Sequence, residues 1–141
     1  MPPVAVFGLS ASVRRAPAIT DDGEEDGVAI HVRDADLPGS PISRTFLGRD
    51  HGAVPISLFI QASPPGHGPG PHRHPYAEVF VLHEGSGSFL AGDETIEASG
   101  GSVVVVPAGE VHGFTASSDD PLRMTCIHTN DEMITEWVEP G

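Results

Sequence analysis

The chain has 141 residues, of which 38% are hydrophobic, 17 are glycine and 14 are proline, a composition that suits one domain of short strands joined by turns. Its formal net charge of −13 argues against nucleic acid or an anionic membrane surface as a partner, because binding either depends on Lys and Arg. The sequence contains no lysine, which excludes Schiff-base chemistry on a lysine amine.

Residues 1–29 are predicted to be an N-terminal extension that ends in an acidic loop, ahead of a domain at 30–141. The apolar stretch near the N-terminus precedes Arg14 and Arg15, whereas a secretory signal has its charges first. No apolar run approaches the roughly 18 residues of a membrane helix. Cys126 is the only cysteine, so no intrachain disulfide can form. We therefore expect a cytoplasmic protein without a membrane partner.

Short β-prone runs alternate with turn residues from residue 30 to residue 129, a pattern typical of an all-β sandwich or barrel. The predicted strands span residues 29–33, 56–63, 77–85, 87–92, 94–99, 102–108, 111–116 and 123–129. The tail after residue 129 is expected to add a short terminal element, with Ile134 and Trp137 packing on the body. No internal repeat is evident, so we expect a single barrel.

Metal-binding residue types gather in the run from residue 66 to residue 85. Residues two apart on a strand point to the same face, so His72, His74 and Glu78 are expected to project into one cavity. His112 follows a Pro-Gly turn and could join them from a neighbouring strand. Three imidazoles and one carboxylate suit a divalent transition metal such as Fe, Mn, Ni, Cu or Zn.

Five other residues have side chains that could take part in chemistry. Two of them remain candidates for the site, and three are expected to have no role in it. Tyr76 is either a cavity wall with a reachable hydroxyl or a packed aromatic residue. His128 is either an inward-facing acid-base or supporting group, or a satisfied core histidine. His67 is expected in an exposed loop, His83 on the face away from the cavity, and Cys126 in the core as an inert residue.

These blocks resemble the two sequence motifs of the cupin superfamily. The first, G-x5-H-x-H-x3-E-x6-G, is matched in full by Gly66, His72, His74, Glu78 and Gly85. The second, G-x5-P-x-G-x2-H-x3-N, is matched by Gly101, Pro107, Gly109 and His112, with Ala116 in place of Asn. That Asn is not a metal ligand in the family. The motifs cover about a third of the chain, and their short spacing is similar to that of small single-domain cupins.

The resemblance implies a single antiparallel β-barrel of the jelly-roll type, with one metal ion bound by His72, His74, Glu78 and His112. It implies a metal-dependent enzyme that acts on a small oxygenated molecule, first by oxygenase-type oxidation and alternatively by isomerisation or cyclisation. Glu78 would anchor the metal or act as a base. A non-catalytic module that binds a small molecule or metal stays open as a further alternative. The resemblance also implies a homodimer.

Overall fold

The computed structural model describes residues 28–139. The predicted N-terminal extension and acidic loop lie almost wholly outside these residues, so the proposed division at residue 29 stays a prediction. Val32 begins the unit that contains every strand of residues 28–139. The strand predicted at 29–33 is wrong, because these residues have no regular structure. Val28 and Ile30 are largely exposed, and no neighbouring strand pairs with them.

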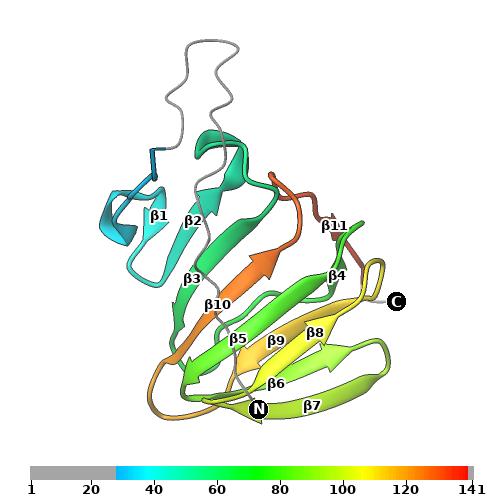
Figure 1. Cartoon of the computed structure of the whole chain (residues 1–141). Coiled ribbons are helices and arrows are strands. Elements are labelled where there is room, and N and C mark those ends of the chain that lie inside the picture. The colour runs from blue at the N-terminus through cyan, green and yellow to red at the C-terminus, as the bar shows by residue number, and fades with distance from the viewer. Residues whose placement is uncertain (1–27, 140–141) are drawn as a thin grey trace, which may run out of the picture. The chain divides into compact units, whose positions relative to one another are not determined.

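The unit that begins at Val32 consists of two antiparallel sheets (Figure 1). The six-stranded sheet contains, in spatial order, β1 (Gly39–Ser40), β2 (Ser43–Leu47), β3 (Ser57–Ser63), β10 (Leu122–His128), β5 (Glu78–Glu84) and β8 (Val103–Val106). The five-stranded sheet contains β11 (Glu136–Trp137), β4 (His72–Arg73), β9 (His112–Ala116), β6 (Ser86–Ala91) and β7 (Glu94–Ser99). Two 3-10 helices, η1 (Asp34–Asp36) and η2 (Gly48–Asp50), complete the regular structure of the described residues. The all-β prediction is confirmed.

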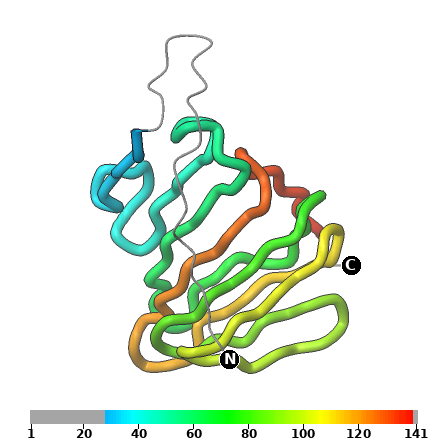
Figure 2. Tube along the Cα trace, in the orientation of Figure 1, coloured from blue at the N-terminus to red at the C-terminus, as the bar shows by residue number. Residues whose placement is uncertain are grey.

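The two sheets stay separate and do not close into one barrel within residues 28–139. Strands β1 and β8 are the edges of one sheet, and β11 and β7 are the edges of the other. The expected single closed barrel is therefore not confirmed. Figure 2 shows the chain passing from one sheet to the other after β4 and again after β5. Neither 3-10 helix, and nothing else in residues 28–139, is a helix of membrane-spanning length and hydropathy.

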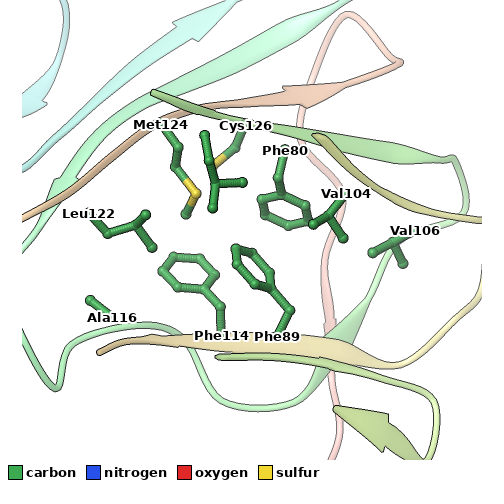
Figure 3. Packing of buried hydrophobic residues seen from close by; sticks show 10 residues of the cluster. Phe80, Phe89, Val104, Val106, Phe114, Ala116, Leu122, Met124 and Cys126 are labelled. Atoms are coloured by element: carbon green, nitrogen blue, oxygen red, sulfur yellow. The ribbon is translucent and has the colours of Figure 1, made fainter. Parts of the chain in front are cut away.

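Alternating side chains of both sheets meet in a shared core (Figure 3). Along β5 and β10 every second residue is buried, as expected for strands with one face on a core. The Phe80 ring of β5 lies 5.2 Å from Phe89 of β6 and 6.0 Å from Phe114 of β9, measured between ring centroids. Each such buried side chain contributes about 1.5–3 kcal/mol to folding. Leu82 of β5 is buried in the same core.

The C-terminal tail forms the expected short terminal element, but Ile134, which was expected to pack on the body, is 45% exposed. Strand β11 pairs with β4, with Trp137 opposite His72 and Glu136 opposite Arg73. Two hydrogen bonds of 2.9 and 3.1 Å from the Arg73 guanidinium to the Glu136 carboxylate also join these strands. Trp137 keeps 61% of its surface exposed, and its ring contacts His72 at 4.9 Å between centroids. The tail thus lies beside the first histidine of the motif.

Candidate metal centre

Four metal-capable side chains come from both sheets and the segment between them. His72 of β4 is directly opposite His112 of β9 in the five-stranded sheet, whereas Glu78 begins β5 of the six-stranded sheet. His74 lies between the two strands. The expectation that His72, His74 and Glu78 share one strand is therefore wrong. Pro75 has no N–H to donate and interrupts strand pairing at this point, so the chain crosses between sheets.

These four residues nevertheless converge. One nitrogen or oxygen atom of each of His72, His74, Glu78 and His112 lies within 4.8 Å of the others. Nε2 of His112 and Nε2 of His74 lie 2.9 and 3.0 Å from Oε1 of Glu78. All four residues are buried, with only 3% of Glu78 exposed. This is a compact set of three nitrogen donors and one oxygen donor at a place closed to bulk water.

Backbone carbonyl groups fix the orientation of each imidazole in the cluster. Nδ1 of His72 donates to the Gly70 carbonyl at 2.8 Å, and Nδ1 of His74 donates to the Ile134 carbonyl at 2.8 Å. Nδ1 of His112 donates to the Glu110 carbonyl at 2.9 Å. An imidazole that carries its proton on Nδ1 has a lone pair on Nε2. The structure therefore aims three Nε2 lone pairs into the cluster, which is how metal-binding histidines are held.

The electrostatics of Glu78 fit a cation at the cluster. Burial favours its neutral acid form, but the contacts with His112, His128 and His74 outweigh burial and hold its pKa well below the usual range. Burial lowers the pKa of His72, whereas the contact with Glu78 overcomes burial at His112 and raises its pKa. Nε2 of His74, though 3.0 Å from Oε1, has no hydrogen-bonding geometry toward it and is the one orphaned buried side-chain N or O atom in residues 28–139. A divalent cation satisfies these lone pairs together.

Tyr76 and His128 support the other oxygen of Glu78. The Tyr76 hydroxyl accepts the Ile134 N–H at 3.0 Å and lies 2.6 Å from Nδ1 of His128, to which it donates when His128 carries its proton on Nε2. This leaves the Nε2 proton of His128 facing Oε2 of Glu78 at 3.2 Å. The Tyr76 ring also stacks on His74 with an interplanar angle of 2°. Of the alternatives left open by the sequence, His128 faces inward, and Tyr76 combines a packed ring with a hydroxyl that binds His128.

A cavity of about 190 Å³ adjoins the cluster. It is lined by Ser43, Phe59, Gln61, Pro69, His72, His74, Glu78, Phe80, Phe114, Cys126, His128, Thr135 and Trp137. Ser43, Phe59 and Gln61 line this cavity but were not among the residues predicted for the site. The alternation of β3 could have found two of them, because Phe59 and Gln61 share a face with the buried Ser57.

His67 and His83 lie away from the cluster. His67 is exposed in the loop before β4 and does not line the cavity. His83 is exposed, and its Nε2 contacts the Thr125 hydroxyl at 3.0 Å. Both positions agree with the expectations from sequence. Cys126 is fully buried beside the cavity, and burial raises the pKa of its thiol well above the ordinary value. It therefore stays a neutral thiol and not a nucleophilic thiolate.

The model of the AraC-like ligand binding domain family matches residues 54–140, and no curated protein matches the chain. Among solved structures, a cupin-like protein from Thermotoga maritima is 22% identical, with a TM-score of 0.61, over 68% of this chain and 74% of that one. The polyketide cyclase RemF from Streptomyces resistomycificus is 21% identical, with a TM-score of 0.64, over 81% of this chain and 88% of that one.

Oxalate decarboxylase from Bacillus subtilis is also similar in structure, with 18% identity and a TM-score of 0.65. The match covers 79% of this chain but only 31% of the decarboxylase. At these identities the three likenesses show a shared fold. They place the two-sheet architecture among cupins, and the four converging side chains lie where two sheets of that fold meet.

Proposed function

Since the chain belongs to the family of AraC-like ligand binding domains, a cupin-like family, we propose that it is a metal-dependent enzyme acting on a small oxygenated molecule. The observation that carries this proposal is the convergence of three oriented imidazoles and one carboxylate beside a cavity. A binding pocket with a few convergent polar groups is where a reacting ligand is expected. The fold alone does not specify the reaction.

Each residue of the cluster has a proposed role. His72, His74 and His112 would bind the ion through Nε2, and Glu78 would bind it through Oε1, since Oε2 faces His128. A bound divalent metal would supply Lewis acidity at the substrate oxygens and, if it is iron or copper, reactivity with dioxygen. The chain's own contribution is to bind and orient the substrate in the cavity and to exclude competing water.

Oxygenase-type oxidation is the reaction class that we propose first, with dioxygen as the oxidant. The apolar walls of the cavity support it, because they suit a small apolar gas beside an organic substrate. Isomerisation or cyclisation is the second candidate. The specific observation that favours it is His128, which lines the cavity and is hydrogen-bonded to Tyr76 behind it; this pair could take up or return a proton next to a bound substrate.

A non-catalytic binding module is the alternative from a different class. The description of the matching family as ligand binding favours it, and the same cavity would hold the ligand without turnover. For the enzyme and for the binding module alike, the partner is a small molecule.

We also propose a homodimer, formed through the outer face of the six-stranded sheet. Val103 and Val105 on edge strand β8 are 60% and 61% exposed there, and light scattering coupled to gel filtration tests this assembly.

Elemental analysis of untagged, chelator-free protein by inductively coupled plasma mass spectrometry tests the proposed function. We expect about one transition-metal ion per chain. Iron or copper would favour oxidation, and zinc would favour isomerisation or cyclisation. A protein that takes up no metal even after incubation with each ion would contradict the proposal and leave the binding module in its place.

A further inference from the structure

The cavity beside the cluster has three layers, which the strand register defines. In the first layer Glu78 of β5 is opposite His128 of β10, which is opposite Ser57 of β3. In the second layer Phe80, Cys126 and Phe59 are aligned in the same way. In the third layer Gln61 of β3 is opposite both Met124 of β10 and Ser43 of β2. The cavity therefore runs from the metal-capable end past aromatic walls to a neutral polar pair.

Four aromatic side chains form walls of the cavity that suit a flat, apolar part of a ligand. Phe59, Phe80, Phe114 and Trp137 line the cavity from four different strands. Phe80 and Phe114 are buried, whereas Trp137 and Thr135 are exposed and so lie at the mouth. Aromatic side chains favour edge and offset-stacked contacts with another ring.

The dimensions of the cavity limit the apolar part of a ligand to one ring. Its volume of about 190 Å³ exceeds the roughly 150 Å³ of a protein cavity that binds benzene, but leaves little room for a second fused ring. Gln61 is four residues from Ser57 along β3, which is about 13 Å at 3.3 Å per residue. A single ring fits between these layers if it has chelating oxygens at one end and a polar substituent at the other.

The charges that line the cavity limit the substrate further. Glu78 is its one carboxylate, and within residues 28–139 no arginine lines it, while the sequence has no lysine. A divalent ion with Glu78 has a net charge of +1, which one anionic oxygen of the substrate neutralises. A second anionic group would lie near Gln61 and Ser43 without a cationic partner, and burying an unpaired charge is strongly unfavourable.

From these observations we infer that the substrate is a single-ring catechol or enediol that binds through two adjacent oxygens as a monoanion. Its remaining body is uncharged, and Gln61 contacts a neutral polar substituent at the far end. His72, His74, Glu78 and His112 would hold the ion, and two adjacent substrate oxygens could chelate it from the cavity side. Dicarboxylates are rejected, because their second carboxylate has no partner. This inference rests on the proposed function.

Two isosteric probes test whether the far end of the substrate must be uncharged. Both are measured on protein loaded with redox-inert zinc. 3,4-Dihydroxybenzamide and 3,4-dihydroxybenzoate share their chelating oxygens and differ in the charge at the opposite end. Isothermal titration calorimetry should give a Kd for the amide at least about ten-fold below that for the acid. Equal binding, or tighter binding of the acid, would overturn the inference. Zinc stoichiometry is measured first, so a protein that binds no zinc contradicts the proposed function instead.

A Gln61→Lys variant tests the position of the far end. A cationic group there should improve binding of 3,4-dihydroxybenzoate and reduce the preference for the amide at least about ten-fold. Ser99→Lys adds the same charge at an exposed position on β7 and should leave the preference unchanged. If the zinc-loaded Gln61→Lys protein folds and keeps the preference of the unmodified protein, Gln61 does not face the ligand and the assignment is wrong.

Discussion

At the scale of single residues, three backbone carbonyl groups determine what the cluster can bind. Each accepts the Nδ1 proton of one histidine, so each Nε2 presents its lone pair to the same small volume. Lone pairs on nitrogen and on Oε1 of Glu78 at 2.9–3.0 Å repel one another unless a proton or a cation lies between them. The burial of these groups would be unfavourable without such a partner.

The substitution His74→Ala tests this arrangement at the atom that has no hydrogen-bond partner. It removes one of three nitrogen donors, and we expect the metal content to fall from about one ion per chain to near zero. Plasma mass spectrometry of the purified variant measures this content. His83→Ala is the matched control, because His83 is exposed on the opposite face. A His74→Ala protein with unchanged metal content would remove His74 from the ligand set.

Tyr76→Phe tests the support of Glu78. The change deletes the hydroxyl that links the Ile134 N–H to His128, so the imidazole whose Nε2 faces Oε2 of Glu78 is held less firmly. Losing such a supporting hydrogen bond typically weakens metal binding 10- to 100-fold, so we expect a rise of that size in the zinc Kd, measured by competition with a chromophoric chelator. Thr129→Val removes a nearby hydroxyl that bonds only the Ala77 carbonyl and should leave the Kd unchanged. An unaltered Kd for Tyr76→Phe would refute the supporting role.

At the scale of elements, two motif glycines differ in what surrounds them. Gly85 joins β5 to β6 with φ of +85°, and a Cβ there would lie 2.5 Å from the Pro121 carbonyl oxygen. Gly101 has a similar φ of +92° but nothing within 4 Å. Gly101→Ala should lower the free energy of unfolding by about 1–2 kcal/mol through backbone strain alone. Gly85→Ala should lower it further, because the backbone near Pro121 must also move.

Urea denaturation of both glycine variants measures this difference. A larger loss of stability for Gly101→Ala than for Gly85→Ala would contradict the contact with Pro121. The comparison also separates two reasons for a motif glycine, a positive φ and a close backbone neighbour, which a sequence motif does not distinguish.

The sequence predicted most of the longer strands but not how they are partnered. Alternating residues in β5 and β10 follow a local rule, so their inward faces could be predicted. The segment 29–33 has a similar pattern and forms no strand, because a strand also needs a neighbour that the local pattern does not reveal. The short β2 was missed for the converse reason. It is a strand because it pairs with β3, and this brings Ser43 to the cavity.

The motif spacing found the four residues that converge but gave the wrong path between them. Same-face parity placed His72 and Glu78 on one strand, whereas they lie in different sheets on either side of Pro75. In either arrangement the side chains point into the same space. The converging residues were therefore predicted correctly, although their assignment to one strand was wrong. The support of Glu78 by His128 depends on the pairing of β5 with β10, a contact 50 residues apart in the chain that spacing does not reveal.

At the scale of the whole molecule, the cluster joins two sheets that do not close into a barrel. His72 and His112 belong to the five-stranded sheet and Glu78 belongs to the six-stranded sheet, so an ion bound by all three would link the sheets directly. Unfolding separates these ligands, and a metal that binds only the folded state stabilises it by about 2.7 kcal/mol at 100 times its Kd.

We therefore expect zinc at 100 times its Kd to raise the Tm by about 10 °C over chelator-treated protein, as measured by differential scanning calorimetry. The His74→Ala variant serves as the control, because its lost donor should remove most of the shift while the core around Phe80 and Phe114 stays intact. An equal shift in both proteins would mean that zinc binds elsewhere. No shift in the unmodified protein, despite one bound zinc per chain, would mean that the unfolded chain binds zinc equally well and that the site does not hold the two sheets together.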